Sequence, residues 1–175
     1  EHHRDQRVAG IVAIAPTASD CEALAEVAAD VPLVTVDGDP TGVLPLVTVD
    51  HEAGAHTATR HLLAAGHRTV WHVRGPADFY AANDHLALGV LRALHEHGRS
   101  VPRDVSVVGF DDVPEAACFP PPLTTIRPDS DAVAAEALDL LPARIADSGA
   151  DAPGRTLGPA LVERRTVAPP AARGG

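Results

Sequence analysis

The segment VSVVGFDDVPEAACFPPPLTTIRPD, which runs from Val105 to Asp129, decides how the rest of the chain is interpreted. It begins as an apolar, β-branched run, which predicts a buried strand, and that run stops at two adjacent acids, Asp111 and Asp112. A proline-rich stretch and a second β-like run follow. In open α/β sheets ligands bind beyond the carboxyl ends of the strands, so two acids at a strand end indicate a binding site.

The same order of apolar strand, polar end and helix continues along the chain. We expect strands in 8–16, 31–39, 44–50, 68–76 and 104–110, and helices in 17–30, 51–67, 84–98 and 129–149. Two of these strands end in acids, at Asp37 and Asp50. Continuous β-branched runs that alternate with helices are typical of parallel sheets covered by helices on both faces. The fold class is therefore α/β, and Pro142 is expected to kink the last helix.

The composition excludes several classes of function. The chain has 175 residues, of which 45% are hydrophobic, enough for one domain or two small lobes. Its 14 Lys and Arg against 24 Asp and Glu give a formal charge of -10, and so acidic a chain is not expected to bind a phosphate backbone by itself. Cys21 and Cys118 form no C-x-x-C pair, which favours a reduced, cytoplasmic setting. No run approaches the ~18 apolar residues of a membrane span.

No catalytic or metal motif is present in the sequence. His51 and His56 are five positions apart, whereas the zinc-binding H-E-x-x-H pattern needs four. There is no G-x-S-x-G motif and no glycine loop that would cradle a phosphate. The sequence therefore predicts neither an enzyme nor a site for a metal or cofactor.

One connection is too short for the predicted topology. A further strand, FYAAND, is expected in 79–84, directly after the strand expected in 68–76. Between Gly75 and Phe79 lie only Pro76, Ala77 and Asp78. A parallel crossover needs roughly a dozen residues. We therefore expect that residues present in a complete chain are missing at this junction.

Three long motifs resemble the effector domains of LacI/GalR-type bacterial transcriptional regulators. They are 49–76, 80–102 and 104–129, and the resemblance extends over most of 7–170. The resemblance implies two α/β lobes of the periplasmic-binding-protein type, both incomplete here. The expected division is 1–78 for a partial N-terminal lobe, 79–127 for a partial C-terminal lobe, and 128–175 for a segment that returns to the N-terminal lobe and ends in a tail.

The resemblance also implies which strand-end residues contact a small molecule. Asp111 is the first candidate, because a carboxylate accepts strong hydrogen bonds from vicinal hydroxyls, although it could simply turn the loop. Asn83 is expected to face the ligand, with Asp84 capping the following helix, or to be a cap itself. Asp50 and His51 are weaker ligand candidates, and a helix cap is the more ordinary role there.

The implied function is an effector-sensing and dimerisation domain. Leu88 and Phe119 correspond to positions that pack across the family's dimer interface, and ordinary core packing is the alternative. The effector is expected to be a sugar or a nucleoside-like compound, and operator DNA to be bound only through a helix-turn-helix segment that this chain does not include. A solute-binding protein of a transporter, or a degenerate remnant that binds nothing, are the rival interpretations.

Overall fold

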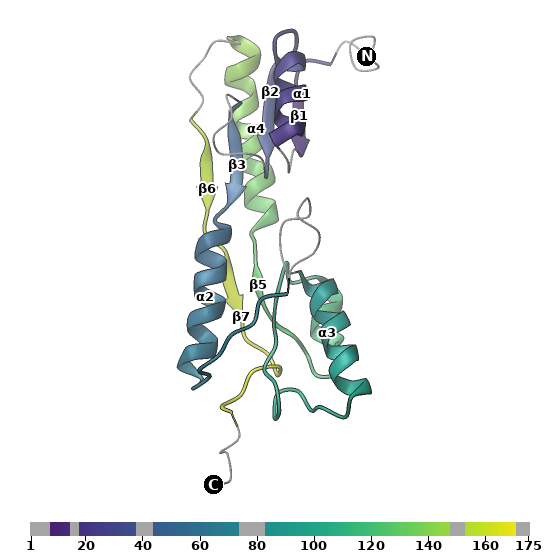
Figure 1. The fold of residues 1–175 in the computed structure, drawn as a ribbon. Helices are drawn as coiled ribbons and strands as arrows, with labels where there is room; N and C mark the ends of the chain where they lie inside the picture. The colour runs from purple at the N-terminus through teal and green to yellow at the C-terminus, as the bar shows by residue number, and fades with distance from the viewer. Residues whose placement is uncertain (1–7, 15–17, 38–43, 74–82, 148–152, 171–175) are drawn as a thin grey trace. The chain divides into compact units, whose positions relative to one another are not determined.

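The computed structural model describes residues 8–14, 18–37, 44–73, 83–147 and 153–170 (Figure 1). The chain forms two compact units. Unit 1 consists of Glu1–Val49 and Asp129–Leu157, and unit 2 consists of Asp50–Pro128 and Gly158–Gly175. The chain therefore passes from one unit to the other three times, after Val49, Pro128 and Leu157.

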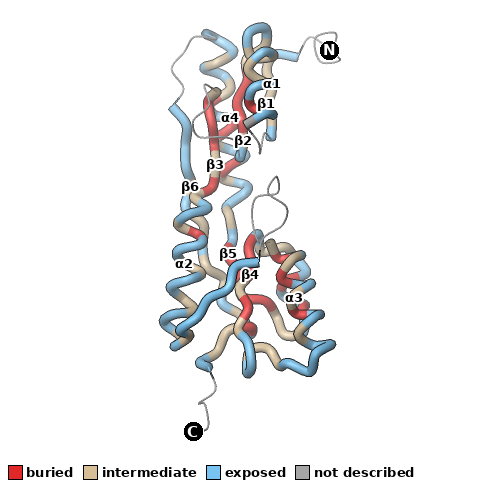
Figure 2. Tube along the Cα trace, in the orientation of Figure 1, coloured by how far each residue is buried: buried red, intermediate tan, exposed pale blue. Residues whose placement is uncertain are grey.

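Unit 1 is built on a parallel sheet with the strand order β1-β2-β3-β6. The strands are β1 (Ile11–Ile14), β2 (Leu33–Val36), β3 (Leu46–Val49) and β6 (Arg155–Leu157). Helix α4 (Ser130–Ala146) packs against all four strands, and α1 (Ala18–Ala28) connects β1 to β2. The inner strands β2 and β3 are buried almost throughout (Figure 2), as expected for strands of a parallel sheet.

The core of unit 1 joins the sheet to α4. Val34 and Val47 are fully buried and pack with Ala137 and Leu140 of the helix. The helix begins where the carboxylate of Asp129 accepts a hydrogen bond from the Ala132 amide at 2.9 Å, and it continues across proline 142. The predicted strands and helices of this unit are confirmed, but the sequence reasoning missed β6.

Unit 2 contains a sheet of the order β4-β5-β7. Strands β4 (Val108–Phe110) and β5 (Thr124–Arg127) are parallel, whereas β7 (Ala160–Val162) pairs with β5 in the antiparallel direction. A 3-10 helix, η1 (Pro114–Cys118), lies between β4 and β5 in the chain. The antiparallel pair corrects the expectation that every strand is parallel. The chain leaves unit 2 just after β5 and re-enters it just before β7, so the start of β7 at Ala160 lies beside the end of β5 at Arg127 and the two strands run in opposite directions.

Helices α2 (His51–Ala64) and α3 (Asp84–Glu96) cover opposite faces of this sheet. Adjacent residues of a strand point to opposite faces. Gly109 of β4 faces Asp84, the first residue of α3, whereas the ring of Phe110 lies against Gly54 of α2. The fold prediction, helices on both faces of a sheet, is therefore confirmed in this unit.

The two units differ from the predicted lobes. Helix α2 belongs to unit 2, because a Cβ at Gly54 would lie only 2.8 Å from Phe110 and 3.3 Å from Ile126. The C-terminal part is also divided, since β6 joins unit 1 and β7 joins unit 2. Sequence periodicity identifies a helix or a strand, but it does not indicate which core that element joins.

The strand predicted for 68–76 does not form in its described part, 68–73. Val70, Trp71 and Val73 are exposed, and Trp71 is 87% exposed. The sheet of unit 2 contains only β4, β5 and β7 among the described residues, and 68–73 forms no ladder with any of them. The rest of that strand, the junction at 76–78 and the strand in 79–82 lie outside the described residues.

Candidate functional site

The turn after β4 carries the two acids that the sequence singled out. Asp111 has φ 100° and Asp112 has φ 51°, a left-handed backbone that residues with a side chain rarely adopt. The amide of Asp111 donates a hydrogen bond of 2.8 Å to the carbonyl of Ile126, which holds the turn on the end of β5. Such strain is concentrated at functional sites in proteins, so the turn is a candidate site on geometry alone.

The side chains of the two acids have different surroundings. Asp111 is exposed at the strand end, as predicted. The side chain of Asp112 is only 6% exposed, and its two oxygens bind different guanidinium groups: Oδ1 accepts from Arg164 at 2.6 Å and Oδ2 from Arg127 at 2.5 Å. Burial opposes ionisation of Asp112, but these two arginines outweigh it and hold the pKa of its carboxyl below the ordinary value.

Arg164 also fastens the C-terminal segment to β5. Its guanidinium donates to the carbonyl of Leu123 at 2.7 Å, and its amide donates to the hydroxyl of Thr124 at 2.9 Å. Two residues on, the buried Thr166 donates to the carbonyl of Val107 and accepts from the amide of Thr124. The sequence reasoning missed these contacts, although the run ERRTV in 163–167 places two arginines beside β-branched residues.

Asn83 is the cap of α3, which is the alternative that the sequence left open for it, and Asp84 is not the cap. Oδ1 of Asn83 accepts from the amide of Leu86 at 3.0 Å, so Asn83 is the N-cap of α3. Asp84 is fully buried and accepts from Thr125 Oγ1 at 2.6 Å and from the amide of Val113 at 2.9 Å. The prediction of Asp84 as the cap is therefore wrong, because its carboxylate turns inward to meet two donors from distant segments.

The pKa of the Asp84 carboxyl is raised. Burial raises it above its ordinary value of 3.8, although hydrogen bonds from Thr125 and Val113 act in the opposite direction. A Cβ at Gly109 would overlap its Oδ1, so glycine is required on β4 for the carboxylate to approach the sheet. Asp84 thus links the start of α3 to β5 and to the turn that contains Val113.

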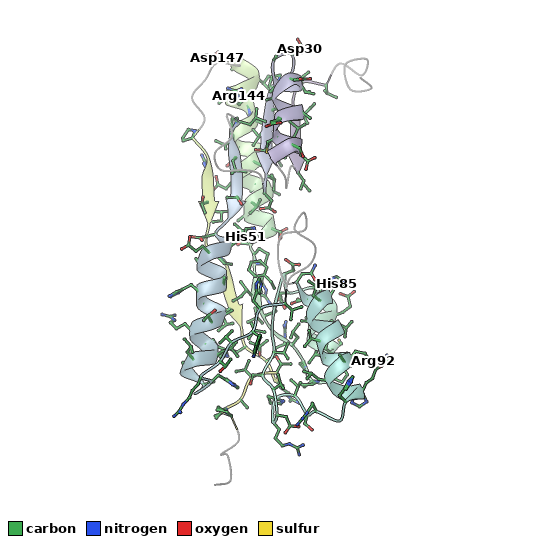
Figure 3. The ribbon with its side chains drawn as sticks, in the orientation of Figure 1. Asp30, His51, His85, Arg92, Arg144 and Asp147 are labelled. Atoms are coloured by element: carbon green, nitrogen blue, oxygen red, sulfur yellow. The ribbon has the colours of Figure 1, made fainter. Side chains whose placement is uncertain are left out.

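Asp50 and His51 form the start of α2. Oδ1 of Asp50 accepts from the amide of Ala53 at 2.7 Å, so the predicted helix cap is confirmed. The ring of His51 lies against that of Phe110, with 5.4 Å between ring centres and 31° between ring planes. Figure 3 shows His51 at the first turn of α2 and His85 at the first turn of α3.

These contacts bring most of the predicted site residues of unit 2 to one end of its sheet. His51 touches Phe110, the last residue of β4, and Asp111 is bonded to the end of β5. Asp84, next to Asn83, binds the amide of Val113 in the same turn. The N-termini of α2 and α3 and the turn after β4 therefore meet at the carboxyl ends of β4 and β5, where α/β folds bind ligands. Contact between these residues and a ligand stays a prediction.

The comparison with known families agrees with this geometry. Residues 41–167 match the family of periplasmic binding protein-like domains. This chain belongs to that family. Within it, the HTH-type transcriptional repressor PurR of Salmonella arizonae is 38% identical to this chain over 117 residues. The match covers 67% of this chain but only 32% of the repressor, so the chain spans about a third of the length of that curated relative.

Solved structures extend the similarity to the whole periplasmic binding protein-like domain. A dimeric Lac repressor with a C-terminal deletion has a TM-score of 0.86 and 25% identity, and the match covers 97% of this chain and 82% of the repressor chain. The transcriptional regulator CelR, in complex with cellobiose, has a TM-score of 0.83 at 24% identity, over 94% and 68% of the two chains. The resemblance to LacI-type regulators is thereby confirmed: the chain corresponds to part of the effector-binding domain of such a regulator.

The two candidate interface residues of the domain have different environments. Phe119 is 8% exposed and packs in the core of unit 2 with Leu91, Leu123 and Ala116. Leu88 is 39% exposed on α3. Core packing is thus the observed environment of Phe119, whereas Leu88 remains accessible for an interface.

Neither a membrane helix nor a metal cluster occurs in the described part of the domain. Among those residues no helix is both long and apolar enough to cross a bilayer. The same residues contain no group of three or more His, Cys, Asp or Glu side chains placed to hold a metal ion.

Proposed function

We propose that this domain senses a small effector, a sugar or a nucleoside-like compound, for a cytoplasmic DNA-binding transcriptional regulator. It acts by binding and not by catalysis. The observation that carries the proposal is the position of the strained turn of Asp111 and Asp112. It lies at the carboxyl ends of β4 and β5, where it meets the N-termini of α2 and α3.

The chemistry of the neighbouring groups suits hydroxyl recognition. The ionised carboxylate of Asp111 accepts the stronger, charge-assisted class of hydrogen bond. The amide group of Asn83 adds donors, because its oxygen is used as the cap of α3 while an amide also carries two N–H groups. The exposed His51, whose ring lies against that of the buried Phe110, adds an aromatic side chain near these polar groups.

Titration calorimetry of the chain tests the proposal. The probes are ribose, cellobiose and D-xylulofuranose, which are bound in structures of similar proteins, together with a set of nucleosides. We expect saturable binding of one probe, weakened in Asp111→Asn and retained in Glu96→Gln, which removes only an exposed ion pair with Arg92. Absence of binding to every probe would favour the degenerate remnant, for which the exposed apolar run 70–73 is the supporting observation.

We further propose that the domain acts as a homodimer through α3. Leu88 is the candidate contact, because it is an exposed apolar side chain on this helix, and operator DNA is bound by a helix-turn-helix segment outside this chain. Sedimentation equilibrium of the chain and of Leu88→Asp measures the effect. An unchanged dimer in Leu88→Asp would refute the assignment of this contact.

A further inference from the structure

We infer that Asp112 couples the Asp111 turn to the two segments that join unit 2 to the later part of unit 1. The inference rests on the proposed function, because it takes Asp111 as the residue that meets the effector. It assigns Asp112 the role of a positioning and coupling residue that does not contact the effector.

The first observation is where the two partners of Asp112 lie in the chain. Arg127 is the last residue of β5 and is followed by Pro128, at which this part of unit 2 ends. Arg164 follows β7, the strand that begins just after the chain re-enters unit 2 at Gly158. One carboxylate therefore holds both the segment that leaves unit 2 and the segment that returns to it.

The second observation is the strength of this clamp. The Asp112 carboxylate is 6% exposed and the Arg164 side chain 17% exposed, so their charges interact with little water between them. Arg127 is 55% exposed, and its arm of the clamp is correspondingly weaker. Arg164 is itself bonded to the Leu123 carbonyl. A shift of Asp112 therefore reaches the residue before β5 through Arg164 and the end of β5 through Arg127.

The third observation is that Asp111 cannot move independently of this clamp. Both acids have left-handed backbone angles, and Asp111 is followed directly by Asp112. A change in the Asp111 backbone therefore acts directly on Asp112, and through its side chain on the two arginines. Coupling between sites requires a physical connection of this kind and not only proximity.

Another route to the same segments exists through the sheet. The Asp111 amide is bonded to the Ile126 carbonyl, and Ile126 is paired with Leu161 of β7. If the sheet ladder carried the effect, removal of an Asp112 arm would not alter it. The two routes therefore predict different outcomes for the same substitution.

Amide chemical shifts of the isotope-labelled chain separate these routes without any effector. Asp111→Asn serves as the perturbation, because asparagine tolerates the left-handed backbone and only the charge is removed. The readout is the first turn of α4, Ser130–Ala132, which follows the passage into unit 1. We expect Asp111→Asn to shift these amides, and we expect Arg127→Gln to abolish that response.

Two further backgrounds make the result decisive. Glu96→Gln breaks the exposed pair with Arg92 on α3, and the response to Asp111→Asn should be retained there. Asp112→Asn should also lose the response, and if that variant does not fold, Arg127→Gln alone decides because its side chain is half exposed. A response that persists in Arg127→Gln, or none in the parent chain, would overturn the inference. Failure of the sugar and nucleoside titrations would count against the proposed function only, since no effector enters this experiment.

Discussion

Gly109→Ala is the substitution that most directly tests the buried carboxylate of unit 2. Gly109 lies in β4, and a Cβ there would overlap Oδ1 of Asp84 and lie 2.8 Å from Cδ2 of Leu123. A relaxed Cβ essentially never approaches backbone or packed groups so closely, so either the strand or Asp84 must move. The glycine has no left-handed φ, and the effect therefore tests packing and not backbone strain.

Two energetic terms set the size of the effect. Overpacking a buried position costs about 1–3 kcal/mol. If Asp84 moves instead, it weakens its bonds with Thr125 Oγ1 and the Val113 amide, and a buried group left unsatisfied costs about 1–3 kcal/mol. The two responses are partly alternatives, so we expect a loss of roughly 3 kcal/mol in the free energy of unfolding of unit 2.

Urea unfolding followed through the amide signals of β4 and β5 measures this loss. The only tryptophan, Trp71, is 87% exposed and would report unfolding poorly. With a slope of about 1–2 kcal/mol per molar urea, the midpoint should fall by roughly 2 M. The matched control is Gly89→Ala, which has no atom within 4 Å of its new Cβ and lies in α3, so it should stabilise the chain by about 0.5–1 kcal/mol.

A double-substitution cycle identifies the cause. In an Asp84→Ala background the overlapped carboxylate is absent, so Gly109→Ala should cost clearly less than in the parent chain. Equal losses in both backgrounds, or a Gly109→Ala protein as stable as the parent, would refute the account of Gly109 as the residue that admits Asp84.

Four further predictions concern the acidic groups of the chain and its net charge. The folded-state pKa of Asp84 lies above 3.8, so its contribution to stability is present below pH 3.8 and is lost as the pH rises through the raised value. Urea titrations at several pH values measure this dependence of the free energy of unfolding on pH. The dependence should vanish in Asp84→Asn. The folded-state pKa of Asp112 is lowered, so its contribution is present above 3.8 and is lost as the pH falls through the lower value; Asp112→Asn should cost about 1–3 kcal/mol at neutral pH, and a change near zero would show that the two arginines do not stabilise the turn. Asp111→Ala should weaken effector binding by about 1.5–3 kcal/mol in calorimetry. Because the chain has a formal charge of -10, it should by itself give no salt-dependent retention in a gel shift with operator DNA.

Local sequence patterns were sufficient for the class of fold and for part of the site. The β-branched runs at β1 to β5, with helices between most of them, predict an α/β protein because strand and helix periodicity are local properties. Asp50 was expected at a helix start because the cap needs only a side chain within three residues of its donor. The change from an apolar run to acids after Phe110 is also local, and it marked the end of a strand.

Only the tertiary structure shows which of the two strand-end acids binds the arginines. Asp111 and Asp112 are the same residue type, and nothing local in the sequence distinguishes them. The two guanidinium groups that bind Asp112 belong to Arg127 and Arg164, which are 15 and 52 positions away in the chain. Asp84 was expected to be a cap, and it is buried because Thr125, 41 positions away, offers a hydroxyl across a glycine gap in β4.

The assignment of elements to cores also required the tertiary structure. The run from 68 to 73 has the composition of a strand, but composition does not supply the neighbouring backbone groups that a ladder needs, and this run pairs with no strand in the described part of unit 2. Helix α2 belongs to unit 2 because Gly54 permits close contact with Phe110, a contact between residues far apart in the chain. The sequence therefore determined the elements and the chemistry at their ends, whereas packing between distant segments determined which core each element joins and which of those end groups became buried.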